Sequence, residues 1–171
     1  MVWRRIFAIL RQETLEMTTA EKLVERLGKL GKTCGTAESC TGGGIGSAIT
    51  AVPGSSAVFM GGIISYDNSV KQGVLGVSPE TLTTVGAVSP ETAEQMALGA
   101  RKVLKVDYAV SVTGIADPDG GSAEKPVGLV WFGIATPDGV NTEKRIFPGN
   151  RAEVRAATVE HALSLLLAAA E

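Results

Sequence analysis

The sequence predicts a three-layer α/β/α domain whose sheet is mixed, mainly parallel, with an antiparallel edge. First, strand-like and helix-like segments alternate over the first two-thirds of the chain, which is typical of parallel strands joined by helical crossovers. Second, the turn sequence Thr-Pro-Asp-Gly at 136–139 lies between two strand-like segments and indicates a hairpin. Third, 171 residues are enough for one domain with a sizeable core.

The expected helices begin at capping residues. Leu23, Leu27 and Leu30 recur at helical spacing, and Thr18 or Thr19 can cap the start of that segment. Two later segments begin Ser-Pro-Glu, where serine caps, proline fits the first turn and the acid complements the helix dipole. The expected helices are 18–32, 41–52, 68–76, 78–86, 89–105 and 150–170.

The strand-like segments are 33–39, 61–67, 106–116, 127–136 and 140–147. The first two are joined by an expected helix, so we predict a parallel pair with a crossover. Parallel strands bring their carboxyl ends to the same edge of a sheet, and ligands of open α/β sheets bind outside those ends. We therefore expect the functional site at this edge.

Composition argues against several classes of function. The formal net charge is −2 and there is no basic stripe, so we expect neither a nucleic-acid partner nor a membrane partner. The longest apolar runs fall short of the roughly 20 residues that span a bilayer. Cys34 and Cys40 are not in a CxxC pair, which is typical of reduced thiols in the cytoplasm. His161 is the only histidine, which excludes a multi-histidine metal centre.

Two expectations concern organisation. Residues 1–17 are predicted to be a loosely ordered N-terminal extension, since their apolar stretch is short and interrupted by arginine, unlike a secretory signal. Residues 18–171 are predicted to form the functional domain. The terminal helix is apolar, so we expect a homo-oligomer, a dimer or higher.

Polar residues stand at the ends of three of the expected strands. Ser39 is the last residue of the first strand-like segment, Tyr66 and Asn68 stand at the end of the second, and Lys71 lies about one helical turn later. Thr113 stands near the end of the third strand. Segments distant in the sequence therefore converge on one crevice.

A serine in this crevice needs a base to become a nucleophile. His161 is far along the terminal helix, so a Ser–His pair is disfavoured. Lys71 can serve if burial lowers its pKa by about three units from about 10.4, and Tyr66 can orient it or relay a proton. Cys40 is an alternative nucleophile, although adjacent residues cannot both point into the crevice, and a thiol facing the core is the simpler interpretation.

Three glycines follow at 42–44. Backbone amides around Thr41 to Gly43, at a helix start, can hold a phosphate or an oxyanion, while the other interpretation is that the glycines permit tight packing. Glu38 is expected to support this loop rather than to act as a base. The polar loop at 113–128 is expected to fold over the crevice, its acids solvated rather than metal-bound.

Several motifs in colinear order, from about residue 18 to the end, together resemble the CinA C-terminal domain family. They are AESCTGG, VPGSSAVFMGGIISYDNSVK, GAVSPETAEQMALGAR, VTGIADPDGGSAEKPVGLVW and NRAEVR. That family includes the stand-alone bacterial nicotinamide mononucleotide deamidases. The resemblance implies an amidohydrolase, without metal or cofactor, that converts nicotinamide mononucleotide to nicotinic acid mononucleotide and ammonia and so returns it to NAD synthesis.

The resemblance also implies roles for individual residues. The family's serine, lysine and supporting tyrosine fall on Ser39, Lys71 and Tyr66, and its arginine near the start of the last helix falls on Arg151. The pocket motifs of the family cover Thr41, Gly42, Gly43, Asn68 and Thr113.

One stretch departs from the family pattern. Where the family usually has GIAGPGGG, this chain has GIADPDGG, so Asp117 and Asp119 replace glycines beside the expected anionic ligand. Repulsion between these carboxylates and a phosphate is expected to weaken substrate binding. The alternative is therefore a non-catalytic, nucleotide-binding regulatory module that keeps the pocket.

Overall fold

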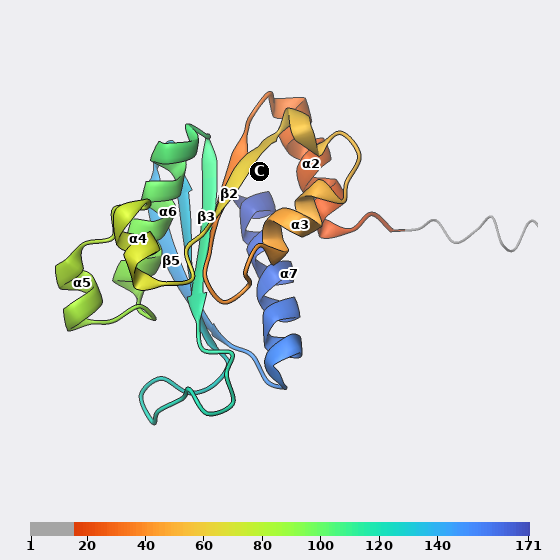
Figure 1. The fold of residues 1–171 in the computed structure, drawn as a ribbon. Helices are drawn as coiled ribbons and strands as arrows, with labels where there is room; N and C mark the ends of the chain where they lie inside the picture. The colour runs from red at the N-terminus through yellow and green to blue at the C-terminus, as the bar shows by residue number, and fades with distance from the viewer. Residues whose placement is uncertain (1–15) are drawn as a thin grey trace, which may run out of the picture.

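The computed structural model describes residues 16–171, which fold around a five-stranded sheet in the order β2-β1-β3-β4-β5 (Figure 1). The strands are β1 (Cys34–Glu38), β2 (Phe59–Ile64), β3 (Tyr108–Gly114), β4 (Leu129–Thr136) and β5 (Gly139–Ile146). β1 pairs in parallel with β2 and with β3, whereas β4 lies antiparallel to β3 and to β5. The predicted mixed sheet with an antiparallel edge is confirmed, and so is the hairpin.

Helices cover both faces of the sheet and complete the three predicted layers. They are α2 (Thr19–Leu30), α3 (Gly44–Thr50), α4 (Asn68–Gly73), α5 (Pro79–Thr84), α6 (Pro90–Leu104) and α7 (Arg151–Ala169), with a 3-10 turn, η1 (Ser55–Ala57), before β2. α2, α3 and α7 lie on one side of the sheet, and α4, α5 and α6 lie on the other (Figure 1). Within residues 16–171 none of the helices has the length and apolarity needed to cross a membrane. Apart from Glu16 and Met17, the extension expected at 1–17 lies outside the described residues.

The core on the α7 side is built from large side chains. Leu27, Ile45 and Leu166, from α2, α3 and α7, are fully buried in one cluster with Val112 and Phe132 of the sheet. Burial of such side chains contributes about 1.5–3 kcal/mol each relative to exposure. This core holds α3 and α7 against the end of the sheet where the crevice was predicted.

The core on the α6 side is built from small residues, so this helix lies close to the sheet. Ala97 and Ala100 are fully buried beside Ala37 and Ala135. A Cβ atom added at Gly133 of β4 would lie 2.3 Å from a backbone oxygen of α6, so only glycine permits this approach. The close packing places the segment before α6 beside the end of β3.

The helix starts are stabilised largely by the predicted chemistry. Thr18 and Asn150 each form a capping box with the glutamate three residues later. Ser78 and Ser89 each accept a hydrogen bond from the amide three residues later, and a proline follows each of them. These caps fix where α2, α5, α6 and α7 begin.

Candidate active site

A cavity of about 250 Å³ lies beyond the carboxyl ends of the parallel strands. Its walls come from the residues after β1, the turn between β2 and α4, the segment before α6, the loop after β3 and the first residue of α7. The predicted site residues that line it are Ser39, Tyr66, Asn68, Lys71, Thr113 and Arg151. Three others, Thr41, Gly42 and Gly43, do not line it.

Alternation along the chain separates three adjacent side chains at the end of β1. Glu38 points towards the start of α3, Ser39 towards Lys71 of α4, and Cys40 packs in the core on the α7 side. The serine is therefore the one of the three whose side chain meets a potential base. This arrangement is the one expected from the sequence, in which adjacent residues cannot both point into the crevice.

Lys71 reaches Ser39 from the first turns of α4. Its Nζ lies 3.1 Å from Ser39 Oγ and donates hydrogen bonds to the backbone oxygens of Ser65 (2.7 Å) and Tyr66 (3.0 Å). Asp67, which caps α4 by accepting from the Ser69 amide at 2.8 Å, fixes the turn that carries both carbonyls. The lysine is thus held by main-chain atoms of its own helix entry.

Burial sets the protonation of this lysine. Lys71 is only 1% exposed, and within residues 16–171 no carboxylate forms an ion pair with it. Burial lowers the pKa of the ammonium below its ordinary value, and the charges of Asp67 and Cys40 only partly oppose this. The three oxygens around Nζ suit an ammonium with three N–H donors, and they suit equally a neutral amine whose lone pair faces the serine hydroxyl.

Glu38 holds the loop together, as expected. Its buried carboxylate accepts hydrogen bonds from the hydroxyls of Thr36 and Thr41 and from the amides of Gly43, Ile45 and Gly46, at 2.6–3.1 Å. It thereby satisfies the free amides at the start of α3 and complements the helix dipole there. For this reason α3 begins at Gly44, later than the start predicted at residue 41.

The expectation that amides around Thr41 to Gly43 face the crevice is wrong for both glycines. The Gly42 amide donates to Ser39 O at 3.1 Å, and the Gly43 amide donates to Glu38. The Thr41 hydroxyl is also bound to Glu38. Gly42 and Gly43 have φ values of 59° and 97°, so the glycines serve the winding of the turn, which is a structural role.

Tyr66 and Arg151 meet at the mouth of the cavity. The Tyr66 side chain is 60% exposed, and its hydroxyl accepts a hydrogen bond from Arg151 Nη2 at 3.4 Å. Its backbone carbonyl, and not its hydroxyl, contacts Lys71. Arg151 Nη1 also lies 2.7 Å from Asp117 Oδ1. The Tyr66 hydrogen bond, followed by the Asp117 charge, raises the pKa of Arg151 above its ordinary value.

The other two predicted lining residues differ in their surroundings. The Thr113 hydroxyl is buried and donates to the backbone oxygen of Ala87 at 2.7 Å, which ties the segment before α6 to β3. Asn68 is exposed at the first position of α4. Thr113 therefore shapes the wall, whereas Asn68 is an exposed lining residue.

Arg155 is a site residue that sequence reasoning missed. It lies one turn after Arg151 on α7, and it donates to the backbone oxygens of Cys40 (3.1 Å) and Thr41 (3.0 Å). It thus fixes the turn after Ser39 from the outside. The (i, i+4) spacing of the two arginines in NRAEVR was the available signal, because residues at that spacing share one helix face.

The two alternative catalytic residues, Cys40 and His161, have environments that differ from those of Ser39 and Lys71. Burial raises the pKa of the Cys40 thiol to about 11, so little thiolate is present near neutral pH. His161 packs against the rings of Phe132 and Phe147 and contacts Glu143 through Nε2 at 2.9 Å. In the part of the chain that the structure describes, no three His, Cys, Asp or Glu side chains gather as metal ligands.

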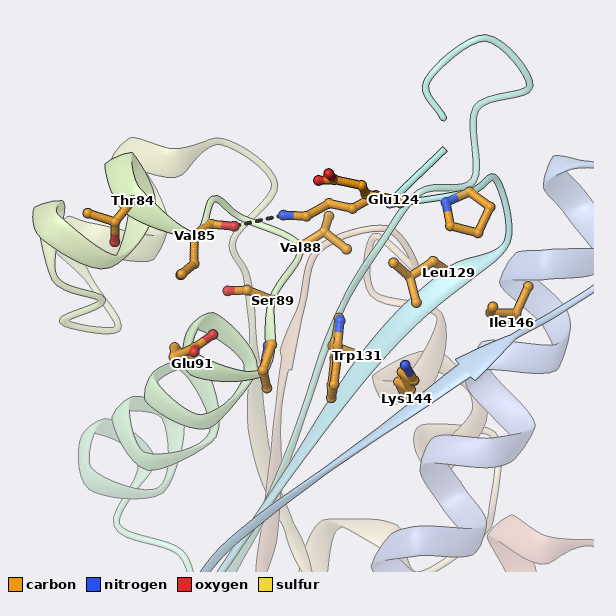
Figure 2. Close-up of a pocket in the computed structure, with 13 residues that line it drawn as sticks. Thr84, Val85, Val88, Ser89, Glu91, Glu124, Leu129, Trp131, Lys144 and Ile146 are labelled. Atoms are coloured by element: carbon orange, nitrogen blue, oxygen red, sulfur yellow. Dashed lines mark hydrogen bonds between the residues drawn. The ribbon is translucent and has the colours of Figure 1, made fainter. Parts of the chain in front are cut away.

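A second, larger cavity of about 530 Å³ adjoins the first and shares Val88 with it. Trp131 stands between Ser89 and Lys144 in this cavity (Figure 2). The Val85 carbonyl accepts a hydrogen bond from Lys125 Nζ at 2.7 Å, drawn as the dashed line in Figure 2. The two cavities lie on either side of the segment before α6.

Comparison with known proteins places this geometry in a family. The sequence profile of the CinA C-terminal domain matches residues 16–170. The nicotinamide-nucleotide amidohydrolase PncC of Escherichia coli K12 is 47% identical over 151 residues, which cover 88% of this chain and 92% of that protein. A CinA-like protein of Cyanothece is 58% identical over 124 residues, but this match covers only 30% of its length. This chain therefore spans about a third of the length of such CinA-like relatives.

A solved structure agrees with the fold as well as with the sequence. The competence/damage-inducible protein CihA of Agrobacterium tumefaciens is 48% identical, with a TM-score of 0.87 over 90% of this chain and 94% of that one. Profile, relatives and structure cover the sheet, both helical layers and the cavity residues. The chain belongs to the CinA C-terminal domain family.

Proposed function

We propose that this chain is an amidohydrolase that converts nicotinamide mononucleotide to nicotinic acid mononucleotide and ammonia, and so returns the pyridine ring to NAD synthesis. The observation that carries the proposal is the 3.1 Å contact between Lys71 Nζ and Ser39 Oγ inside a cavity where the lysine is buried. The PncC relative, 47% identical and matched over 92% of its length, supports the choice of substrate.

Catalysis begins with the neutral amine of Lys71. With its two N–H groups directed to the carbonyls of Ser65 and Tyr66, its lone pair accepts the proton of Ser39. Ser39 Oγ then attacks the carboxamide carbon and forms a tetrahedral oxyanion. When this intermediate collapses, the C–N bond breaks and Lys71 returns the proton to the leaving ammonia. Water, deprotonated by Lys71, then hydrolyses the acyl-serine ester.

The oxyanion needs donors other than the glycines first expected. Within residues 16–171 the amides of Cys40 and Thr41 have no backbone carbonyl as acceptor, and Cys40 lines the cavity next to Ser39. Because Cys40 lines the cavity and Thr41 does not, we assign the oxyanion to the Cys40 amide. Arg155 donates to the carbonyls of Cys40 and Thr41, so it holds the turn that carries this amide without touching the substrate.

Substrate orientation follows from the charges along the cavity. The carboxamide lies inside, next to Ser39, and the phosphate lies at the mouth, where Arg151 can bind it with two N–H groups. The second candidate function, a binding module without turnover, is favoured by the Asp117 carboxylate, which already occupies Arg151.

The test is ammonia release from nicotinamide mononucleotide by the wild type and three variants. Ser39→Ala and Lys71→Met are each expected to lower kcat by about a thousandfold or more, since each removes one member of a pair that acts as a unit. Cys40→Ala is the matched control at the neighbouring position and is expected to stay within about threefold. Turnover by Ser39→Ala at the wild-type rate, or loss of it only in Cys40→Ala, contradicts the assignment.

Calorimetry with the same nucleotide, together with the ammonia assay, distinguishes a binding module from an amidohydrolase. A binding module binds nicotinamide mononucleotide and releases no ammonia, and Lys71→Met then has no activity to lose. An amidohydrolase binds it and turns it over.

A further inference from the structure

The mouth of the active-site cavity contains an ion pair that the proposed chemistry does not use. Arg151 Nη1 and Asp117 Oδ1 are 2.7 Å apart, and the two side chains are 40% and 66% exposed. Arg151 is the first residue of α7, whereas Asp117 belongs to the loop between β3 and β4. In Figure 1 this loop and the start of α7 lie at the same end of the sheet. Two segments distant in the sequence thus meet across the opening.

Because few of the lining residues are charged, this ion pair determines how strongly the cavity binds an anionic ligand. The charged side chains that line the cavity are Lys71, Asp117 and Arg151. Lys71 is buried, and burial disfavours its charged form, so Arg151 is the cation that remains for an anion at the mouth. Its Nη1 already has a carboxylate partner, and its Nη2 has the Tyr66 hydroxyl.

The carboxylate is placed where it can be exchanged for another anion. Asp117 is bound to Arg151 by its side chain, while its backbone oxygen accepts a separate hydrogen bond from the Gly120 amide at 3.1 Å. Because the side chain is largely exposed, rotation into water releases Arg151 without moving the loop backbone. A phosphate oxygen and a carboxylate oxygen offer the guanidinium the same kind of acceptor.

We propose that the Asp117 carboxylate is an internal substitute for the substrate anion and so determines specificity at the mouth of the site. It orients Arg151 while the site is empty and must leave when a phosphate binds. It therefore weakens the binding of phosphorylated carboxamides relative to their unphosphorylated counterparts. The inference rests on the proposed function, because it assumes that the carboxamide reacts at Ser39 and the phosphate lies at Arg151.

The experiment compares two substrates that differ only in the phosphate: nicotinamide mononucleotide and nicotinamide riboside. Asp117→Asn keeps the size of the side chain and removes its charge. It is expected to lower KM for the mononucleotide by about threefold to tenfold, the range that one exposed ion pair and one removed like-charge contact imply. KM for the riboside is expected to change by less than about twofold, and kcat is expected to stay within about twofold for both.

Asp119→Asn is the matched control, because it removes an equal charge from the same loop at a position outside the cavity lining. It is expected to leave the ratio of the two KM values within about twofold of the wild type. An Asp117→Asn enzyme whose KM ratio equals that of the wild type, or in which both KM values fall equally, overturns the proposal. So does an Asp119→Asn enzyme with the same effect as Asp117→Asn.

A binding measurement distinguishes failure of this inference from failure of the proposed function. If the wild type releases ammonia from neither compound, the proposed function fails, and the role of Asp117 is decided by calorimetry with inorganic phosphate. Asp117→Asn is then expected to bind phosphate about threefold to tenfold more tightly than the wild type. Equal affinities overturn the inference whether or not the protein is an enzyme.

Discussion

Of the two adjoining cavities, the smaller one contains the more unusual cation. The larger one, beside Trp131, has about 530 Å³, and its cations have partners or lie in the open: Lys125 donates to Val85 O, and Lys144 lies over the indole ring. The smaller one has about 250 Å³ and contains Lys71, which is 1% exposed and, among the residues that the structure describes, forms no ion pair with a carboxylate. Volume alone would select a cavity other than the one to which we assign the chemistry.

The difference teaches that a candidate catalytic site is better identified by polar groups held at a cost in stability than by volume. A buried amine without a counter-ion is destabilising, and it persists because the turn at Ser65 and Tyr66 supplies two carbonyls to it. The walls of the larger cavity carry no such group. Three experiments sharpen or break this contrast, and each pairs a residue near the smaller cavity with a reference.

The largest effect on stability is expected at Glu38. Glu38→Gln replaces one acceptor oxygen by an NH2 group that faces backbone donors, so the free energy of unfolding is expected to fall by about 3 kcal/mol. Glu91→Gln is the control, because Glu91 lies in the first turn of α6, lines the larger cavity and is exposed. It is expected to change stability by less than about 0.5 kcal/mol in urea denaturation. Equal losses in the two variants would remove the contrast.

The second effect is a pH dependence that belongs to Lys71. Its folded pKa lies below 10.5, and the neutral form is the base, so kcat/KM is expected to rise about tenfold per pH unit until pH passes that pKa. Stability follows with the same sign. Between the folded and unfolded pKa values the unfolded chain binds more protons, so the free energy of unfolding rises with pH in that window.

The reference for this pH dependence is Lys71→Met, which lacks the titrating group. This variant is expected to be more stable than the wild type near neutral pH, because it lacks the buried amine. Its advantage in free energy of unfolding is expected to narrow as pH rises towards 10.5. Urea unfolding at several pH values measures it. A constant difference, or a kcat/KM that shows no rise with pH anywhere in the range where the protein is folded, contradicts a buried lysine base.

The smallest effect concerns two buried serines, one near each cavity. Among the residues that the structure describes, the Ser65 hydroxyl has no hydrogen-bond partner, whereas the Ser89 hydroxyl caps α6 and donates to Gly86 O at 2.9 Å. Ser65→Ala is expected to raise the free energy of unfolding by about 1 kcal/mol, and Ser89→Ala to lower it by about the same amount. Thermal unfolding gives both signs. Destabilisation by both substitutions would mean that Ser65 is satisfied after all.

Much of the fold could be predicted because its signals are local. Capping at Thr18, Ser78, Ser89 and Asn150 depends on residues within four positions, and the hairpin depends on the turn at 136–139. The parallel pairing of the first two strands and the common edge followed from the crossover rule. The presence of Ser39 and Lys71 at one edge was therefore predictable and their pairing was a hypothesis, whereas the two backbone carbonyls that hold Lys71 were not expected.

Interactions between distant residues account for what sequence reasoning missed. The amides of Gly42 and Gly43 were expected to be free, but Glu38 and the Ser39 carbonyl occupy them once the turn closes. The role of Arg155 depends on the packing of α7 against that turn, which the sequence did not reveal. Which acceptor a donor finds depends on side-chain direction, and residue types do not specify that direction.

The order of residues along the chain determined the elements, the parallel crossover and the edge at which polar side chains gather, because periodicity and capping act over a few residues. Tertiary packing alone decided that Lys71 is buried against Ser39 and that Arg151 is paired with Asp117. The physical reason is that a charge responds to the solvent and partners around it, and the folded chain supplies both.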